Sequence, residues 1–451
     1  MKIKARSHQK LKNNLRWDML LLLDQIEEQG EYSNMAIDQY LSQTKRSELD
    51  SNLVVKVVYG SLQRRLTLDY YLKDFLKGKI ESWVRSLLRL SIYQALYLDR
   101  VPQHAIVNEA VEIAKVNGHQ GIANLVNGVL RNFFRQPLKA LDQIADPLER
   151  LSIQYSLPQW LVVYFQKHLS PDSLQAFLAS LNQRPHLSAR INGLADQRSE
   201  LQRELHDQGC RVTLSQVSPY GVRIESGPAL SSPAFKAGHF TIQDESSMLV
   251  APLGKLQGDE RVLDACAAPG GKATHIASFL TSGRLTALDI SARKLNILSQ
   301  HAQRMGLADK IKIRATDALK FEPDSKKPFD VIYLDAPCSG IGLMRRKPEI
   351  KYLKDYDQVL ELAELQEQLF DHLLSLLKAG GRLIYSTCTL TYEENEELVA
   401  KLLAKHSNLE IEAIQSHEVL QEDLLTNQGF IRVWPHQFET DGFFISRFIK
   451  N

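Results

Sequence analysis

Apolar residues in the first 140 positions recur at the spacing of amphipathic helices. They fall at i, i+3, i+4 and i+7 in three stretches, within 53–62, 84–96 and 122–134. This spacing places the apolar side chains of each stretch on one helix face, which normally packs into a core. The stripe residues are Leu53, Val54, Val57, Val58, Leu62, Val84, Leu87, Leu88, Ser91, Ile92, Ala95, Leu96, Ile122, Leu125, Val126, Val129, Leu130, Phe133 and Phe134. We therefore predict an all-α bundle over residues 1–140, without a catalytic constellation of its own.

The pattern changes twice after residue 140. Three prolines first interrupt short helices, at Pro137, Pro147 and Pro158, and mark a boundary. Residues 141–239 then mix short helical and strand-like stretches, which predicts a linker and a small α/β subdomain. Its expected elements are helices over 172–181 and 197–208 and strands over 187–192, 212–214 and 222–224.

From residue 240 to residue 451, strands and helices alternate regularly. Buried strand-like runs precede helical stretches, a helix over 360–377 is followed by Gly380 as a cap, and a last strand covers 442–449. Such alternation is typical of an α/β domain with a mostly parallel sheet. The fold class predicted here is a chain of three parts: a helical bundle, a small α/β subdomain and a larger α/β domain.

Carboxylates stand at the ends of four strand-like runs in this last domain. They are Asp264, Asp289, Asp317 and Asp335. In parallel sheets the carboxyl ends of the strands share one edge, and open α/β sheets bind their ligands there. Any one of these residues taken alone is equally explained as a turn or helix cap.

A glycine turn follows the first of these strands, in Asp264-Ala-Cys-Ala-Ala-Pro-Gly-Gly-Lys272. Glycine allows close approach of the backbone, and amides at the start of the next helix meet polar ligand groups. Only Gly270 and Gly271 are present, so the dinucleotide pattern Gly-x-Gly-x-x-Gly fits poorly. Asp289, 25 residues beyond Asp264, is suited to accept hydrogen bonds from both hydroxyls of a ribose.

Two cysteines carry the candidate chemistry. Cys338 lies in Asp335-Ala-Pro-Cys-Ser-Gly, and Cys388 follows a strand-like run within Ser386-Thr-Cys-Thr. Carbon 5 of cytosine is a poor nucleophile, and a thiolate that adds to carbon 6 converts the ring into an enamine that attacks an electrophilic methyl group. One cysteine would add, and the other would help the enzyme release its product. The alternative is that both are small, buried apolar residues.

Length and composition agree with a large enzyme of a reducing compartment. The 451 residues, 44% of them hydrophobic, suffice for two or three domain cores. Four cysteines without a Cys-x-x-Cys pair argue against a disulfide framework and against a zinc site, so we expect no metal and a cytoplasmic location. The apolar run from Met19 to Leu23 stops at Asp24, so neither a signal peptide nor a membrane span is expected.

The net charge of +2 is unevenly distributed. Residues 1–140 carry an excess of seven positive charges and the remainder an excess of five negative ones. Residues 1–16 hold no acid, which suits a flexible arm that contacts phosphates, although a solvated tail explains it equally well. The basic residues of this arm are Lys2, Lys4, Arg6, Lys10, Lys12 and Arg16.

These motifs together resemble the family of ribosomal RNA small-subunit methyltransferase B, within the wider NOL1/NOP2/Sun group. The resemblance covers essentially the whole chain. Its marks in the catalytic half are Gln243-Asp-Glu-Ser-Ser, Cys266-Ala-Ala-Pro-Gly-Gly-Lys272, Asp335-Ala-Pro-Cys-Ser-Gly and Ser386-Thr-Cys-Thr. The helical front, with His104-Ala-Ile-Val-Asn-Glu-Ala-Val and Asn124-Leu-Val-Asn-Gly-Val-Leu-Arg-Asn, is similar to the antitermination factor NusB.

The resemblance implies a NusB-like domain over 1–140 that binds RNA and a Rossmann-like class I methyltransferase domain over 240–451. The implied reaction is methylation of carbon 5 of a cytidine in 16S ribosomal RNA, with S-adenosylmethionine as methyl donor. Cys388 would be the nucleophile, and Cys338 would serve product release. In such a mechanism we expect Asp335 to hold or protonate the ring at nitrogen 3 and to bond the exocyclic amine. The residues implied to line the cofactor are Cys266, Ala267, Ala268, Pro269, Gly270, Gly271, Lys272, Asp289, Asp317 and Asp335. For Cys266 itself, packing is the better interpretation.

The expected partner is 16S ribosomal RNA, naked or in an assembling small subunit, bound by a monomer. The target cytidine must be single-stranded or flipped out of a helix. Arg345, Arg346 and Lys347, just beyond the Cys338 loop, are candidates for phosphate contacts, with an idle surface run as the alternative. Three other functions remain: a transfer-RNA 5-methylcytosine enzyme, an amino-methylating enzyme, which usually pairs an Asp/Asn-Pro-Pro-aromatic loop with no cysteine, and a non-catalytic ribosome-assembly factor.

Overall fold

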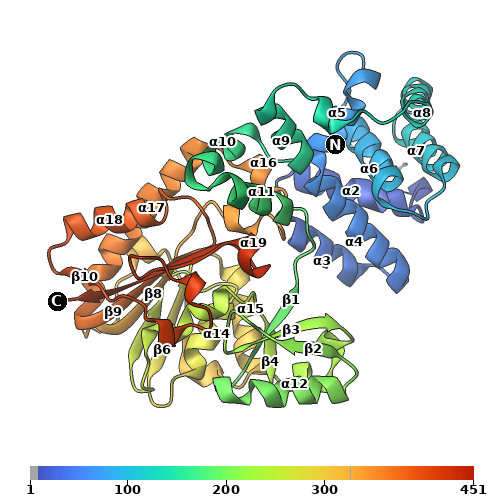
Figure 1. Ribbon diagram of the computed structural model, residues 1–451. Helices are drawn as coiled ribbons and strands as arrows, with labels where there is room; N and C mark the ends of the chain where they lie inside the picture. The colour runs from blue at the N-terminus through green and yellow to red at the C-terminus, as the bar shows by residue number, and fades with distance from the viewer. Residues whose placement is uncertain (1–8, 326) are drawn as a thin grey trace. The chain divides into compact units, whose positions relative to one another are not determined.

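A computed structural model describes residues 9–325 and 327–451 of the chain (Figure 1). The chain divides into two compact units. The first, the helical unit, consists of the residues up to Asn182 together with Met344–Leu353; the second, the catalytic unit, consists of Gln183–Leu343 and Lys354–Asn451. The first half of the predicted basic arm, residues 1–8, lies outside the described residues.

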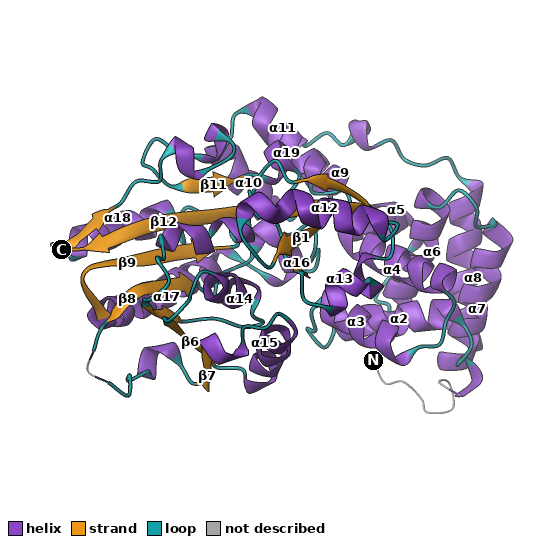
Figure 2. Ribbon diagram, turned by 90° about the horizontal axis from the view of Figure 1, so that it is seen from below, coloured by secondary structure: helices purple, strands orange, loops and turns teal. Residues whose placement is uncertain are grey.

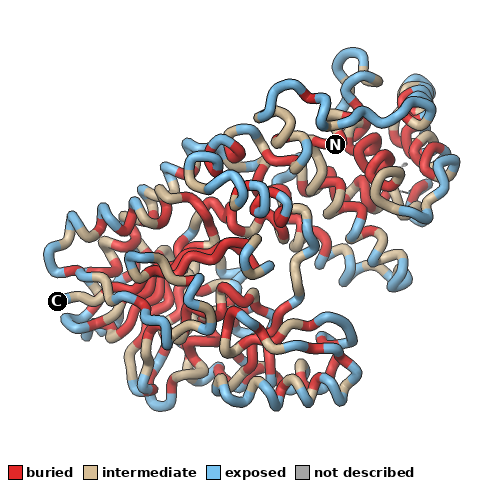
Figure 3. The backbone as a smooth tube through the Cα atoms, viewed as in Figure 1, coloured by how far each residue is buried: buried red, intermediate tan, exposed pale blue. Residues whose placement is uncertain are grey.

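The helical unit confirms the all-α prediction. The predicted stripe of 84–96 lies on α6, where Leu87, Leu88 and Ile92 are fully buried, and α6 ends at Tyr97, ahead of Pro102. Together with the neighbouring helices these residues form one apolar core, and the buried stretches of these helices are marked in Figure 3. The principal helices are α2 (Leu15–Glu27), α3 (Ser33–Gln43), α4 (Glu48–Gln63), α5 (Arg65–Leu72), α6 (Ser82–Tyr97), α7 (Gln103–Asn117), α8 (Gln120–Arg135), α9 (Pro147–Tyr155), α10 (Gln159–His168) and α11 (Pro171–Ser180).

Three of these helices, α9 to α11, lie in the range expected for the linker and small subdomain. They group instead with the bundle. The hydroxyl of Thr67 donates to the carbonyl of Ile153, and the amide of Leu66 donates to Ser156 Oγ at 2.8 Å, so α5 and the end of α9 are joined directly. The helical unit therefore extends about forty residues beyond the expected boundary at 140.

A distant stretch of the chain, Met344–Leu353, also belongs to the helical unit and contains the short helix α16 (Ile350–Leu353). Polar contacts, buried or partly buried, join this stretch to the bundle. The Ser33 amide donates to Glu349 at 2.9 Å, Lys351 Nζ donates to the carbonyl of Gln63 at 2.9 Å, and the hydroxyls of Tyr352 and Ser156 lie 2.8 Å apart. Burial holds the pKa of Lys351 well below its usual value.

The catalytic unit begins with a small antiparallel sheet in the order β2-β3-β1-β4. It packs against α12 (Arg198–Asp207) through a small apolar core that includes Leu201, Leu205 and Val222. Its strands are β1 (Leu187–Ile191), β2 (Arg211–Leu214), β3 (Gly221–Ser226) and β4 (Phe240–Ile242). The predicted strands and the second predicted helix are thus present, and β4 carries the sheet three residues into the range expected for the catalytic domain.

The large sheet of the catalytic unit has the order β10-β12-β9-β8-β5-β6-β7, with β11 paired to β12 (Figure 2). The strands in the run β7-β6-β5-β8-β9 are parallel, and β12 is antiparallel to β9. The bounds are β5 (Arg261–Asp264), β6 (Arg284–Asp289), β7 (Ile311–Ala315), β8 (Phe329–Asp335), β9 (Leu377–Thr387), β10 (Leu409–Ile411), β11 (Ile431–Val433) and β12 (Phe443–Lys450).

Helices cover both faces of this sheet. Val262 and Val331 face a core shared with α14 (Gly271–Ser278) and α15 (Ala292–Arg304), while Leu263 and Ile332 face a core shared with α17 (Tyr356–Leu376) and α18 (Glu396–Lys405). Alternate residues of each strand therefore enter different cores, which is why the strands are apolar throughout. The predicted α/β architecture is confirmed.

One local prediction was wrong. Gly380 does not cap the preceding helix, because α17 ends at Leu376 and β9 begins with the next residue. Gly380 instead has a φ of +71° inside the first part of β9, where the register with β8 is irregular. None of the helices in the described part of the chain combines the length and apolarity that a membrane span needs.

Candidate active site

The strand order brings the four predicted carboxylates to one edge of the large sheet. Asp317, Asp289, Asp264 and Asp335 follow or end the neighbouring strands β7, β6, β5 and β8. Burial raises the pKa of the Cys266 thiol, and all four carboxylates lie close enough to raise it further. Cys266 is therefore a neutral thiol, and it packs against the apolar core beneath the edge.

The glycine turn between β5 and α14 is shaped by protein packing as much as by any ligand. Gly270 has a φ of +113°, and a Cβ there would lie 2.6 Å from Cδ1 and 3.0 Å from Cα of Leu298. The glycine therefore makes room for α15, and its expected role in letting the backbone approach a ligand stays a prediction. At Gly271 a Cβ would come no closer than 3.7 Å to a neighbouring side chain, that of Gln243, which is an ordinary contact distance, so a Cβ would fit there without a clash.

Asp289 supports the same turn. Its Oδ2 accepts from the amide of Ala268 at 3.2 Å, and its Oδ1 accepts from the amide of Ser291 at 2.8 Å. The next residue, Ile290, is 80% exposed, which places a bare apolar side chain at the ligand edge. Asp317 Oδ1 accepts from the Leu319 amide at 3.0 Å and so caps a short helical turn. The alternative interpretation of this residue as a helix cap therefore holds for Oδ1.

Asp264 is the most unusual of the four carboxylates. It is 1% exposed and lies against the Cys266 backbone, yet neither oxygen has a well-formed hydrogen bond among the residues that the structure describes. Burial, and secondarily the charge of Asp335, raise the pKa of Asp264 to about 7. A buried carboxyl group of this kind favours a cationic ligand, because a nearby positive charge offsets the cost of ionising it.

Asp335, at the end of β8, is held from two sides. Lys272 Nζ lies 2.8 Å from its Oδ2, and the hydroxyl of Ser386 donates to its Oδ1 at 2.9 Å. Lys272 comes from the first turn of α14 and also lies over the ring of Phe443. Burial alone would lower the pKa of Lys272, but Asp335 outweighs it and the pKa is raised, so the lysine carries its charge.

Cys338 and Cys388 meet because the strands that precede them are neighbours. Asp335 of β8 pairs with Ser386 of β9, and the cysteines follow three and two residues later. Their sulfurs lie 3.3 Å apart. The hydrogen bond to Cys388, together with burial, raises the pKa of Cys338 well above its usual value. Cys338 is therefore a thiol and acts as the donor when Cys388 is ionised, and all four cysteines are free.

The two cysteine loops are tied together by residues that the sequence did not single out. The amide of Gly342 donates to the carbonyl of Cys388 at 3.0 Å. A Cβ at Gly342 would lie 2.1 Å from the carbonyl oxygen of Gly442, so no larger residue fits there. Glu394, fully buried two residues before α18 begins, accepts hydrogen bonds from residues of both loops. In the sequence it lies in an acidic run, Tyr392-Glu-Glu-Asn-Glu, which is typical of an exposed helix start.

The basic run Arg345-Arg346-Lys347 lies in the stretch that belongs to the helical unit. Arg345 is only 5% exposed, and Lys347 Nζ stands 4.7 Å from the centroid of the Tyr32 ring. Arg346 and Lys347 are half-buried. A phosphate contact by Arg345 would require this stretch to move, so the predicted RNA role fits the other two residues better and stays a prediction.

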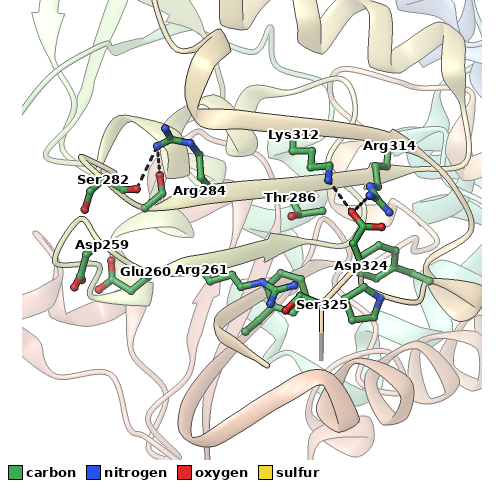
Figure 4. A pocket seen from close by; sticks show the side chains of 14 residues that line it. Asp259, Glu260, Arg261, Ser282, Arg284, Thr286, Lys312, Arg314, Asp324 and Ser325 are labelled. Carbon is green, nitrogen blue, oxygen red and sulfur yellow. Dashed lines mark hydrogen bonds and ion pairs between the residues drawn. The ribbon is translucent and has the colours of Figure 1, made fainter. Parts of the chain in front are cut away.

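A separate hollow of about 410 Å³ opens at the opposite edge of the parallel strands (Figure 4). It lies where β5, β6 and β8 begin, with Arg261, Arg284 and Phe329 in its wall. Lys312 and Arg314 line it too, but both are paired with Asp324. Open α/β sheets bind their ligands at the other edge, so this hollow is not part of the site. Across the described ranges, no group of His, Cys, Asp and Glu side chains has the arrangement of a metal site.

Comparison with known families gives three matches along the chain. The model described as 16S rRNA methyltransferase RsmB/F matches residues 251–449, and that of the NusB family matches residues 14–135. The model for the ferredoxin-like domain of RsmF/B-like methyltransferases matches residues 157–231. Most of the small sheet, with α12, thus corresponds to a named domain, and that family model also takes in α10 and α11, which group by their contacts with the helical unit.

Relatives cover nearly the entire chain. A Bacillus subtilis protein named as a probable ribosomal RNA small subunit methyltransferase B is 38% identical, over 96% of this chain and 98% of the relative. An Escherichia coli ribosomal RNA small subunit methyltransferase B is 31% identical, over 98% of this chain and 100% of the relative.

The crystal structure of the protein PH0851 covers 96% of this chain and 99% of its own, with 26% identity and a TM-score of 0.83. A structure of NSun6 from Pyrococcus horikoshii with SFG shares the fold over 65% of this chain and 98% of its own, with 23% identity and a TM-score of 0.57. The identities over nearly full length show that the chain belongs to the 16S rRNA methyltransferase RsmB/F family.

Proposed function

We propose that this protein methylates carbon 5 of a specific cytidine in 16S ribosomal RNA through a covalent bond between Cys388 and carbon 6. The observation that carries the proposal is the pair of sulfurs 3.3 Å apart, beside the ion pair of Lys272 and Asp335. Two free thiols in contact, of which one has a raised pKa, suit a reaction in which one thiolate attacks and must later leave.

The residues of the sheet edge fit S-adenosylmethionine, which carries two cationic centres, a ribose and an adenine. The buried Asp264 carboxylate would face the cationic part, Asp289 the ribose hydroxyls and exposed Ile290 the adenine. A Cβ at Gly271 would meet no close neighbour, so we propose that the cofactor approaches the turn at this residue. When bound, this cofactor supplies an electrophilic methyl group. Asp317 and the Cys266–Lys272 turn complete the proposed lining.

The protein's own residues account for the activation of the base. Cys388 adds as a thiolate to carbon 6, which moves electron density to carbon 5 and to the ring nitrogen and carbonyl. Asp335, held by Lys272 and Ser386, accepts a hydrogen bond from the exocyclic amine and passes a proton to nitrogen 3, which neutralises that charge. Because Lys272 is charged, a positive group lies beside the site during every step of the reaction.

Product release requires that carbon 5 lose its proton and that the bond between carbon 6 and sulfur break. Cys338 is a thiol because its pKa is raised, so it donates a hydrogen bond to the departing sulfur of Cys388, keeps its proton and stabilises the leaving thiolate. A protonated thiol is a poor base. The raised pKa therefore favours a water molecule positioned near Cys338, over Cys338 itself, as the acceptor of the carbon 5 proton.

The RNA is proposed to be held by the helical unit, including Arg346 and Lys347, with the target cytidine unpaired or flipped out. We propose that the enzyme acts as a monomer in the cytoplasm, on naked RNA or on an assembling subunit. A transfer-RNA substrate would use the same cysteines. Methylation assays on separated ribosomal and transfer RNA pools distinguish the two, and bisulfite sequencing of ribosomal RNA from a strain without the gene names the nucleotide.

The covalent mechanism is tested by substituting each cysteine. Cys388→Ala should neither methylate nor form an adduct. Cys338→Ala should methylate once and then stall as a complex that resists denaturant, formed with S-adenosylmethionine and absent from the double variant. RNA containing 5-fluorocytidine should trap the wild type similarly, since fluorine does not leave as a proton does. If Cys388→Ala forms the adduct and Cys338→Ala does not, the roles are exchanged. If neither variant, nor the wild type on fluorinated RNA, forms one, the mechanism is wrong.

A further inference from the structure

Glu394 is a fully buried carboxylate that accepts four hydrogen bonds and has no cationic partner among them. Its Oε1 accepts from the Ser339 amide at 2.8 Å and from Gln366 Nε2 at 2.9 Å. Its Oε2 accepts from the hydroxyls of Ser339 at 2.5 Å and of Thr391 at 2.6 Å. All of these donors are themselves buried.

The donors come from both cysteine loops. Ser339 directly follows Cys338, and Thr391 lies three residues after Cys388. The hydroxyl of Ser339 also lies 2.6 Å from that of Thr389, the residue directly after Cys388. One carboxylate therefore collects hydrogen bonds from the two segments whose sulfurs must meet.

Neighbouring side chains extend the same network. Gln366 of α17 also donates to the carbonyl of Pro337, directly before Cys338, at 2.9 Å. Asn395 accepts from the hydroxyl of Thr387 at 2.6 Å and donates to the carbonyl of Thr389 at 3.2 Å. The residues on either side of each cysteine are thus fixed from the start of α18 and from α17.

A buried carboxylate is costly unless every acceptor site is used, so such a network is stable in one arrangement and poorly stable in others. A purely apolar contact would hold the two loops less precisely, since it tolerates small shifts at little cost. Catalysis does not tolerate them: a displacement of about 1 Å costs on the order of a hundredfold in rate.

We propose that Glu394 is a positioning residue that fixes the Cys338 loop against Cys388, and thereby sets the rate at which the enzyme releases methylated RNA. It contacts neither substrate nor cofactor in this role. The part of the proposal that concerns release rests on the proposed functions of the two cysteines. The part that concerns the distance between the sulfurs does not.

The chemistry of the network predicts how two substitutions differ. In Glu394→Gln the amide oxygen takes the place of Oε1, and the amide NH2 takes the place of Oε2. The hydroxyls of Ser339 and Thr391 rotate and accept from this NH2 group, so most hydrogen-bonding groups of the network keep a partner in the conservative variant. In Glu394→Ala all four donors lose their acceptor, and the loops are released from one another.

The first readout is the rate of disulfide formation between Cys338 and Cys388 in the RNA-free, full-length protein. Diamide is the probe: it takes up the two thiol hydrogens and is reduced to the hydrazine, while the sulfurs move from 3.3 Å to a bond of about 2.05 Å. Mass spectrometry of the linked peptides separates this bond from any that involve Cys210 or Cys266. We expect Glu394→Ala to form it at least about tenfold more slowly, and Glu394→Gln within about threefold of the wild type.

The second readout is turnover on ribosomal RNA. Glu394→Ala should lower kcat by about 10-fold to 100-fold with KM within about twofold, and should accumulate the denaturant-resistant complex with RNA in the presence of S-adenosylmethionine. Glu394→Gln should restore kcat. The matched control is Glu418→Ala, which removes a carboxylate that accepts from buried Arg447 at 2.7 Å and lies outside both cysteine loops. It should lower thermal stability and leave the disulfide rate unchanged.

Ser339→Ala covers the case in which Glu394→Ala does not fold, because it removes one hydroxyl and leaves the carboxylate with three of its four donors, the amide of residue 339, Gln366 and Thr391. It should slow both disulfide formation and release in the same direction. A folded Glu394→Ala, or Ser339→Ala in its place, that crosslinks and turns over like the wild type overturns the proposal. If the wild type forms no adduct even with 5-fluorocytidine, the proposed mechanism fails, and the disulfide readout still decides the positioning role.

Discussion

The ammonium of Lys272 lies 2.8 Å from the carboxylate of Asp335, although the two residues are 63 positions apart in the chain. Lys272 comes from the helix after the glycine turn, and Asp335 from the strand that leads into the Cys338 loop. The pair therefore links the proposed cofactor turn to the proposed base-binding residue. It also places a charged lysine beside the cysteines, since the pKa of Lys272 is raised.

Lys272→Met should remove this link while keeping most of the aliphatic side chain. Asp335 then retains Ser386 but loses its counter-ion, and breaking a partly buried pair in this way costs roughly 1–3 kcal/mol. We expect the methylation rate to fall by about tenfold or more, because about 1.4 kcal/mol corresponds to a factor of ten. Lys255→Met is the control: that lysine pairs with Glu412 at 2.9 Å, and its side chain is 38% exposed. If Lys272→Met and Lys255→Met show equal rates, the pair has no part in the reaction.

Asp264 should make the protein less stable as pH rises from about 4 to about 7. An unfolded aspartate loses its proton near its ordinary pKa, whereas burial keeps Asp264 protonated in the folded state until about pH 7. Between these values the folded state holds more protons, so the free energy of unfolding falls with rising pH, by at most on the order of 4 kcal/mol. Above about pH 7 both states are ionised and the penalty is complete.

Asp264→Asn removes that penalty. The variant should match the wild type in stability near pH 4 and exceed it most above pH 7, which denaturant unfolding across the pH range measures. The same variant should bind S-adenosylmethionine more weakly, because the cation loses its carboxylate. If calorimetry shows unchanged affinity, Asp264 does not contact the ligand. If the difference in stability between variant and wild type does not change with pH, the raised pKa of Asp264 is contradicted.

Gly270 and Gly271 should respond differently to the same substitution. Gly270→Ala forces a side chain onto a φ of +113° and against the backbone of Leu298, so we expect losses of roughly 1–3 kcal/mol in stability as well as in cofactor affinity. Gly271→Ala meets no described protein atom closer than 3.7 Å, so it should fold normally and lose cofactor affinity alone. Thermal unfolding and calorimetry on both variants test this contrast. A Gly270→Ala protein as stable as Gly271→Ala would contradict the packing argument.

Several site residues were predictable because their positions follow from the order of parallel strands. Asp264, Asp289 and Asp335 each end a buried strand, and parallel strands end at one edge. The contact of Cys338 with Cys388 needed one fact more, that β8 and β9 are neighbours. Residue spacing does not contain that fact, which comes from the observed order of the strands.

Other features depend on long-range packing that leaves no local signal. Glu394 lies in an acidic run that resembles a solvated helix start, and only tertiary contacts bury it. Leu298, which leaves no space for a side chain at Gly270, is an ordinary apolar residue of α15. Similarly, Met344–Leu353 joins a unit whose other residues end at Asn182, because Glu349 and Lys351 find their hydrogen-bond partners there.

The helical unit should bind RNA mainly through charge. We predict that residues 1–182, which keep the hydrogen bonds between α5 and α9, fold as a helical domain and bind RNA weakly, with an affinity that falls steeply with added salt. A fragment that stops at residue 140 should be less stable, because the face of α5 that contacts α9 is then exposed to solvent. Circular dichroism and thermal unfolding compare the two fragments.

Exposed arginines on α8 are the variants of choice for this test. Arg131→Glu combined with Arg135→Glu should lower affinity and reduce the slope of log affinity against log salt by about one for each phosphate that the variant no longer neutralises. Lys167→Glu, exposed on α10 and outside the stretch that matches the NusB family, is the control and should change the slope little. Filter binding at several salt concentrations gives these slopes.

A fragment that binds no RNA at low salt, or whose affinity does not change with salt, would mean that the helical unit docks a protein partner instead. The RNA would then have to be held by the catalytic unit alone.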